Sequence, residues 1–223
     1  MPNPHCFGSV QACAMRVGKL DDAGAPDPGA DNLYVTDSLI TVQTSYEIET
    51  GAEFIQKNGC GAICQNFKEQ DKLKRVTLAL QLCQFDYELL ALMLDATPII
   101  GDVVTANGTI GIVLPSSTAP ASNGVSLEIW SKAWDGGSQA VSSGGDPLYH
   151  HFAWPKTTWV PGQRTIEAGI MVIPVDGIGT ENPTIGDGPV DDFPIWGPEG
   201  PELVWLDDSI PDAVCGYQAL VAS

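Results

Sequence analysis

The clearest pattern in the chain is an alternation of apolar and other residues between positions 74 and 84. Every second position carries an aliphatic side chain: Val76, Leu78, Leu80 and Leu82. The positions between them carry Arg75, Thr77, Ala79, Gln81 and Cys83. Because alternate side chains of a β-strand point to opposite faces, this stretch is predicted to be a strand with one buried face.

Residues 33–47 contain a second alternation, with Thr, Gln and Ser on one parity and Ile, Val, Thr and Tyr on the other. Thr, Val, Ile and Tyr are favoured in strands, so a second long strand is predicted here. Shorter strand candidates, separated by Gly, Pro, Ser and Asn, are residues 14–20, 99–106, 109–114, 125–133, 148–155, 165–175 and 203–207.

Residues 85–95 have helical rather than strand character. Asp86 is a good N-cap residue, Glu88 falls in the first turn, and the Leu, Ala and Met residues that follow are good helix formers. We predict one short helix here, packed against a sheet by its broad apolar surface.

Three segments lack such patterns. Residues 1–32 are predicted to be an N-terminal arm or loop, residues 48–72 a long inter-strand loop, and residues 195–223 an acidic C-terminal extension. Many short strands with a single helix are typical of a sandwich or barrel. The sequence therefore predicts one mainly-β domain over residues 1–223: two packed antiparallel sheets, arranged as a sandwich or partial barrel, with one short flanking helix.

The balance of charge excludes two classes of partner. The 223 residues include 10 basic and 28 acidic residues, which gives a net charge of −18. Electrostatic adhesion to nucleic acid or to an anionic membrane needs a basic surface. No apolar run is long enough to span a bilayer, and the N-terminus lacks the pattern of a signal peptide, so we expect synthesis in a cytoplasm.

The charges are also unevenly distributed along the chain. No Lys or Arg follows Arg164, whereas eleven acidic residues do. Half of the basic residues lie between Lys57 and Arg75. The simpler interpretation is a solvated acidic surface. The sharper one is that complementary parts of the chain meet head to tail in an assembly.

No constellation of catalytic residues emerges from the sequence. His150 and His151 are neighbours in a strand-like stretch and would point to opposite faces, which favours packed or surface histidines over a metal pair. No nucleophile-elbow or phosphate-loop motif occurs, and residues 177–179 (Gly-Ile-Gly) are interpreted as a turn. Cys60 and Cys64 have a spacing that zinc permits, but no second pair follows, which favours buried or loop thiols. We expect no enzyme activity, metal or cofactor.

Three stretches of the sequence are similar to one family of proteins. They are residues 34–40 (YVTDSLI), residues 57–64 (KNGCGAIC) with 72–76 (KLKRV) and the junction 85–89 (FDYEL), and residues 182–194 (NPTIGDGPVDDFP). Together they resemble the major tail proteins, or tail tube subunits, of long-tailed phages that infect actinobacteria. The resemblance covers residues 14–194 in patches.

This resemblance implies that the chain is a structural protein of the virion tail. Subunits of that family form rings, expected to be hexameric, that stack into a tube through which DNA passes without specific binding. A long hairpin contributes strands to a continuous inner barrel, and loops with the N-terminal arm join adjacent rings. The implied partners are further copies of the chain, a tape measure protein and a tail terminator, assembled in the host cytoplasm without a membrane.

Within this interpretation, the polar parity of the two long strands is predicted to face the lumen. The lumen-facing candidates are Thr41, Gln43, Ser45, Glu47, Arg75, Thr77, Ala79 and Gln81, with Arg75 paired to Glu47. Negative charge would keep such a wall from binding DNA phosphates. Ring-to-ring contact with an acidic edge of the next ring is predicted for the 48–72 loop, with candidate residues Lys57, Asn58, Lys68, Lys72 and Lys74.

Two alternatives stay open beside this hypothesis. One is another β-sandwich protein of the virion, such as a capsid decoration protein or a tail terminator. The other is a carbohydrate-binding module that uses the tryptophans, all six of which lie in the second half of the chain. Tryptophans fill cores and interfaces more often than they stack on sugars, so the structural subunit is the leading interpretation.

Overall fold

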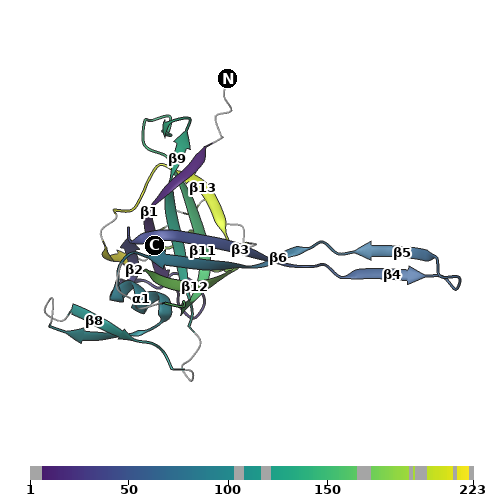
Figure 1. Cartoon of the computed structure of the whole chain (residues 1–223), viewed down its shortest axis with the longest axis horizontal. Helices are drawn as coiled ribbons and strands as arrows, with labels where there is room; N and C mark the ends of the chain where they lie inside the picture. The colour runs from purple at the N-terminus through teal and green to yellow at the C-terminus, as the bar shows by residue number, and fades with distance from the viewer. Residues whose placement is uncertain are drawn as a thin grey trace.

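A computed structural model shows the chain as an antiparallel β-structure with one helix (Figure 1). The residues that it describes are 7–102, 108–116, 122–164, 172–190, 193, 200–212 and 215–220. In chain order the elements are β1 (Gly8–Lys19), β2 (Gly29–Thr36), β3 (Leu39–Glu49), β4 (Glu53–Lys57), β5 (Ile63–Lys68), β6 (Lys72–Leu82), α1 (Tyr87–Leu94), β7 (Thr97–Gly101), β8 (Gly108–Val113), β9 (Val125–Asp135), β10 (Ser138–Gln139), β11 (Tyr149–Pro161), β12 (Ile173–Thr180), β13 (Leu203–Asp207) and β14 (Gly216–Leu220).

Ten strands form one large sheet in the order β14-β2-β1-β9-β11-β12-β6-β3, with β10 beside β9 and β13 beside β11. Strand β11 belongs to two layers, because its first half pairs with β9 and β13 and its second half pairs with β12. The register with β9 shifts between Trp154 and Thr157, around Pro155, and such a bulge bends a strand. The sheet therefore folds over on itself. The predicted class, mainly antiparallel β in a sandwich-like arrangement with one helix, is confirmed.

The space between the two layers is filled by one large apolar core. Its members from β6 are the alternate residues that the periodicity predicts to be buried: Val76, Leu78, Leu80 and Leu82. They belong to one cluster with side chains of the other layer and of the helix: Met15, Val17, Tyr34, Leu127, Ile129, Leu89, Leu90 and Met93. Full burial of one such aliphatic side chain stabilises the fold by about 1.5–3 kcal/mol, so this core holds the layers together.

The helix α1 forms where the sequence predicts it. The carboxylate of Asp86 accepts a hydrogen bond from the Leu89 N–H at 3.1 Å and caps the first turn. The helix ends at Asp95, whose φ of 50° places it in the left-handed region, and the N–H of Asp95 bonds back to the Ala91 carbonyl. In the part of the chain that the structure describes, no helix could cross a lipid bilayer.

A second, smaller core covers the outer face of the layer that contains β1, β9 and β13. It is formed by Leu20, Ala153, Ile185 and Phe193, with Leu203 and Trp205 packed against it. The segment that follows β12 contributes Ile185 to this core and is anchored beside it by Asn182. Its side-chain amide donates to the carbonyl oxygens of Gly24 at 2.7 Å and Pro155 at 3.2 Å.

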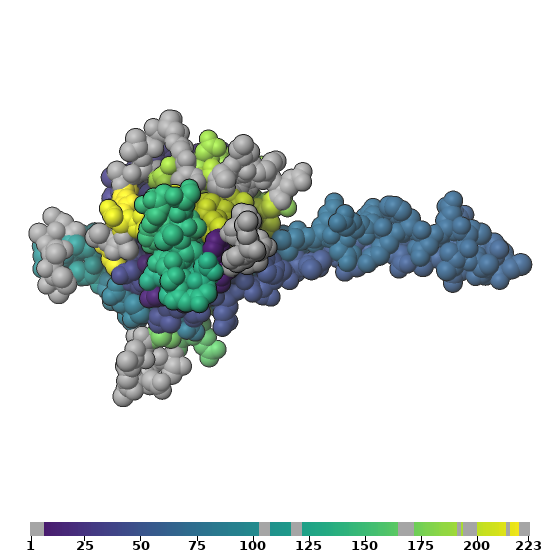
Figure 2. All heavy atoms as spheres, turned by 90° about the horizontal axis from the view of Figure 1, so that it is seen from above, coloured from purple at the N-terminus to yellow at the C-terminus, as the bar shows by residue number. Residues whose placement is uncertain are grey.

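The predicted loop over residues 48–72 is wrong, because this segment is a long β-hairpin. β3 and β6 pair to their ends at Glu49 and Lys72, and beyond them β4 and β5 pair again. We call residues 50–71 the arm. It projects far from the body of the molecule (Figures 1 and 2). The sequence does not reveal its strands because every residue of β4 and β5 is exposed, so no alternation of burial marks them.

Several predicted boundaries also differ from the structure. Residues 1–32 are not only an arm or loop, since they contain β1 and the start of β2. The predicted strand 33–47 is interrupted at Asp37 and Ser38, which separate β2 from β3. The predicted C-terminal extension 195–223 contributes β13 and β14 to the large sheet. Parts of the predicted strands 99–106 and 165–175, namely residues 103–106 and 165–171, lie outside the described residues.

The turn predicted at Gly177 and Gly179 is also wrong, because both residues lie within β12. They alternate with Asp176, Ile178 and Thr180 and face the core. A Cβ atom on Gly177 would lie 2.5 Å from the ring of Trp159. Glycine is therefore required at this position so that the Trp159 ring can lie against the sheet.

Candidate assembly surfaces

The residues predicted to face a lumen lie together on one face of the sheet. β3 and β6 pair so that Thr41 is opposite Gln81, Gln43 opposite Ala79, Ser45 opposite Thr77, and Glu47 opposite Arg75. Residues that are directly opposite in an antiparallel pair project to the same face. The alternation in the sequence therefore groups these eight residues correctly.

This face continues across β12 and the second half of β11. Its members there are Asp176, Ile178 and Thr180 from β12, with Lys156, Thr158 and Val160 from β11. We call the fourteen residues on these four strands the polar face. None of them is buried. Most carry hydroxyl, amide or small apolar side chains, and the two acids, Glu47 and Asp176, are matched by two bases, Arg75 and Lys156.

The predicted pairing of Arg75 with Glu47 is present. The guanidinium of Arg75 donates a hydrogen bond to the Glu47 carboxylate, and the Lys74 ammonium lies 3.4 Å from the other carboxylate oxygen. The hydrogen bond from Arg75 is the main reason why the pKa of Glu47 is lowered from its ordinary value. The charge of Glu47 on the polar face is therefore balanced within the chain itself.

Both sides of this four-stranded layer have open edges. β3 is the last strand of the sheet, and no strand among the described residues pairs with its outer edge. On the other side, β12 is the only described strand that pairs with the part of β11 beyond Thr157. The reverse side of β3 also exposes apolar side chains, with Ile48 61% exposed. An exposed edge of this kind is a site for pairing with another chain.

The residues predicted to join rings are spread along the arm and its base rather than clustered. Lys57 ends β4, and the Asn58 side chain accepts hydrogen bonds from the N–H groups of Cys60 and Ala62 at 3.0 and 2.9 Å, which shapes the tip. Lys68 pairs with Asp71 at 3.2 Å, and Lys74 pairs with Glu47. Lys72 lies at the base, opposite Glu49. Two of the five candidates are thus neutralised within the chain.

Sequence reasoning missed the apolar side chains of the arm. Phe54 and Phe67 lie opposite each other in β4 and β5, with ring centroids 6.4 Å apart, and are 58% and 61% exposed. Ile55 and Ile63 are also exposed. A cross-strand aromatic pair on an isolated hairpin was not visible in the sequence because the hairpin itself was not predicted.

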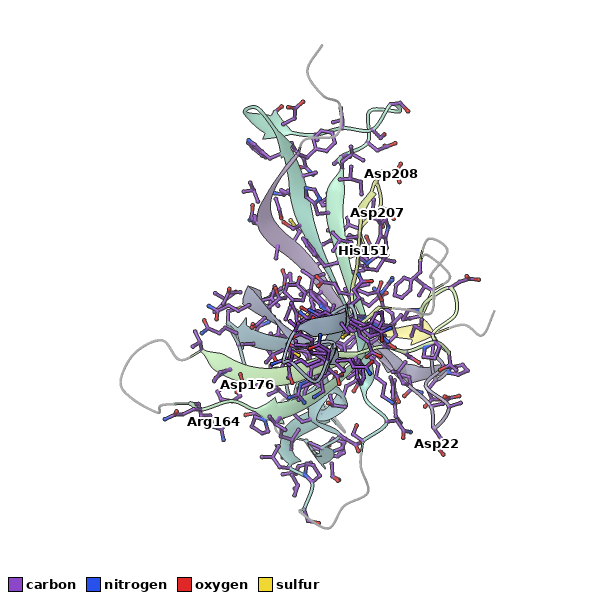
Figure 3. The ribbon with its side chains drawn as sticks, turned by 90° about the vertical axis from the view of Figure 1, so that its right-hand side faces the viewer. Asp22, His151, Arg164, Asp176, Asp207 and Asp208 are labelled. Atoms are coloured by element: carbon purple, nitrogen blue, oxygen red, sulfur yellow. The ribbon has the colours of Figure 1, made fainter. Side chains whose placement is uncertain are left out.

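A buried ionic cluster was also missed. The Arg16 guanidinium donates to both carboxylate oxygens of Glu128, with Nε 2.8 Å from Oε1. Nε2 of His151 lies 3.1 Å from Glu128, and Nδ1 lies 3.1 Å from Asp207 (Figure 3). The imidazole is enclosed by the rings of Trp130 and Trp205, at centroid distances of 3.9 and 3.7 Å. The cluster joins β1, β9, β11 and β13.

The charges in this cluster stabilise each other. Burial by itself raises the pKa of Glu128, but the charge of Arg16 and the hydrogen bond with His151 outweigh it and lower the pKa. Burial also acts to raise the pKa of Asp207, whereas bonds with His151 and Ser209 bring it well below its usual range. Both ring nitrogens of His151 contact carboxylates and its side chain is buried, so the cluster links the strands that carry its members.

Three of the tryptophans, Trp130, Trp154 and Trp159, are buried, so they are not available to stack on sugars; Trp196 lies outside the described residues. Cys60 and Cys64 are free and exposed on the arm. Across the described ranges, no group of three or more His, Cys, Asp or Glu side chains is arranged to hold a metal ion. No protein-family model matches the sequence, and no curated protein is similar to it.

Proposed function

We propose that this protein is a structural subunit that forms rings, stacked into the tail tube of a long-tailed phage, and that the tube conducts DNA without binding it. The observation that carries the proposal is the four-stranded layer with an exposed polar face and open edges on both sides. A layer of this form can be extended by identical layers from neighbouring copies until a closed barrel leaves no free edge. The sequence resemblance to major tail proteins points the same way.

The dimensions of such a barrel suit its role. Six copies would contribute about 24 strands, and at about 4.8 Å per strand with a tilt of about 40° the backbone diameter is roughly 45–50 Å. Barrels of about 16–18 strands already enclose an aqueous channel. A ring of six copies would therefore be wide enough for a DNA duplex after side chains are added.

The chemistry of the polar face supports passage without adhesion. Proteins bind DNA largely by placing Lys and Arg against phosphates, which releases condensed counterions. On the polar face, Arg75 is paired with Glu47, and Lys156 is matched in number by Asp176. The sequence suggested a negatively charged wall, whereas the polar face has no net charge. A neutral wall also offers no excess of Lys and Arg to bind DNA phosphates. The excess of acidic residues lies mainly off this face.

Electron microscopy of the purified protein in negative stain tests the proposal. We expect rings or hollow tubes. Ile48→Glu places a charge beside the open edge of β3 and should abolish rings, whereas Val204→Glu, an equivalent change at an exposed position of β13, should not. A wild-type protein that stays monomeric at all concentrations would refute the proposal. Quenching of tryptophan fluorescence by glycans would favour the carbohydrate-binding alternative.

A further inference from the structure

An apolar pocket of about 400 Å³ lies between α1, the β7–β8 hairpin and the adjoining ends of β11 and β12. Its rim is formed by large side chains that are partly exposed in the single chain: Phe85, Tyr87, Ile99 and Leu114. Leu90 and Leu94 of α1 also line it, together with the basic residue Arg164. Its volume falls in the range of pockets that enclose small ligands, so it has room for aromatic side chains.

The arm carries an apolar surface that is exposed to solvent in the single chain. Phe54 and Gln56 of β4 lie opposite Phe67 and Gln65 of β5, so these four side chains project to the same face of the hairpin. We call these four residues the aromatic face, and none of them is charged. An isolated two-stranded hairpin is marginally stable in water. The arm therefore gains most from a partner that covers Phe54 and Phe67.

The arm and the pocket lie at opposite ends of the same strands. β6 begins at Lys72, at the base of the arm, and ends at Leu82, opposite Ile173 of the pocket lining. The length of β6 separates them by about 33 Å. The arm points away from α1 and β8, which carry part of the pocket lining (Figure 1). The arm thus cannot reach the pocket of its own chain. A second copy shifted along the strand direction can present its pocket to this arm.

The charges favour a second copy as the occupant. Residues 49–75 contain five basic and four acidic residues, whereas the rest of the chain contains five basic and 24 acidic residues. Two bodies of strongly negative charge repel each other, and the arm is the segment that can approach another body without this repulsion. Lys57 is exposed near the tip of the arm, and Asp86 and Glu88 flank Tyr87 of the pocket.

The size of the arm suits a specific interface. Every residue of β4 and β5 is exposed, on both faces of the hairpin. Stable interfaces bury about 800 Å² on each partner and involve about 20–30 residues on each side. The arm with its base can supply most of one side of such a contact.

We propose that the aromatic face of the arm docks into this pocket on a copy in the adjacent ring. The contact is heterologous, since different surfaces of identical chains meet, and it repeats from ring to ring without closing. It rests on the proposed function, in which rings stack into a tube. It adds the receiving surface, which the sequence did not suggest, and the docking residues Phe54 and Phe67 in place of the lysines.

Two variants and their mixture test the inference. Phe67→Glu damages the aromatic face, and Ile99→Glu damages the rim of the pocket. Each variant alone is expected to form rings that do not stack. When the two are mixed, intact arms of the Ile99→Glu rings meet intact pockets of the Phe67→Glu rings, so pairs of rings should appear and nothing longer. Ile55→Glu, on the other face of the arm, should still form tubes.

The outcomes separate this inference from the proposed function. If the wild-type protein forms neither rings nor tubes, the proposed function fails. If Phe67→Glu stops stacking but Ile99→Glu still forms tubes, the arm docks elsewhere and the pocket assignment is overturned. The same holds if the mixture yields single rings only, or if Ile55→Glu and Phe67→Glu behave alike.

Discussion

Individual residues show most clearly where the sequence is informative and where it is not. Asp86 is predicted as a cap because its partner, Leu89, is three residues away. The pair of Glu47 and Arg75 is predicted because the two strands that carry them are recognised from their alternation, and the correct register of these strands places the two residues opposite each other. The cluster around His151 could not be predicted, because Arg16 and Glu128 are 112 positions apart and Asp207 is 56 positions from His151. Only the assembled layer brings these charges together.

The buried cluster around His151 makes the stability of the fold depend on pH in the acidic range. Glu128 and Asp207 have pKa values below those of the unfolded chain, so they stabilise the fold above the unfolded values of about 4, and this stabilisation is lost as the pH falls towards their folded values. Glu128→Gln should lower the free energy of unfolding at pH 7 by about 3–5 kcal/mol, because it removes the buried carboxylate charge that faces Arg16 and His151. It should also flatten the fall in stability below about pH 5.

Urea unfolding followed by tryptophan fluorescence between pH 3 and pH 7 measures both effects. Glu181→Gln, at an exposed position, is the control and should leave the curve unchanged. Equal acid dependence in the wild type and in Glu128→Gln would show that the cluster does not contribute to stability in this way.

Among the elements, β6 and the arm mark the two limits of prediction. β6 is buried on one face only, so its sequence alternates and its strand and core residues are predicted correctly. β4 and β5 are exposed on both faces, so their sequence carries no such signal. β2 and β3 read as one strand because the alternation runs through the break at Asp37 and Ser38, which only the sheet order reveals.

The arm can be removed without opening the body. Glu49 and Lys72 are register partners, so a two-residue Asn-Gly turn can replace residues 50–71 and close the hairpin. No arm residue belongs to either apolar core. The shortened protein should therefore keep its thermal unfolding temperature within a few degrees and form rings that no longer stack.

Circular dichroism and electron microscopy check the two parts of this prediction. A shortened protein that unfolds at a much lower temperature would show that the arm supports the fold. Normal tubes from a folded, shortened protein would contradict the assignment of the arm to ring-to-ring contact.

For the whole molecule, the arrangement of charge matters more than its total. The net charge of −18 first suggested a wall that repels DNA, but the polar face is neutral and the acids lie mainly elsewhere. Among the C-terminal acids, Asp176 lies on the polar face, whereas Asp207 is turned to His151 in the other layer (Figure 3). The sequence predicts the separation of charge along the chain, and the fold decides which surface receives it.

A cation placed on the polar face tests whether this face forms a neutral wall around the DNA. Thr77→Lys would add one unpaired charge per subunit to the wall, and tubes of this variant should bind short duplex DNA with an affinity that falls steeply as salt is raised. Val204→Lys, at an exposed position of β13, is the matched control and should not bind. Fluorescence anisotropy with labelled duplexes measures the difference. Equal binding by both variants would contradict the placement of Thr77 in the wall.

Electron cryomicroscopy of the assembled wild-type protein tests the central claim most directly. The account predicts hollow tubes of stacked rings in which β3, β6, β12 and the second half of β11 form the inner wall. The side chains of Gln43, Thr77 and Asp176 should face the bore. Tubes with these residues on the outside, or a protein that forms no tube, would contradict it.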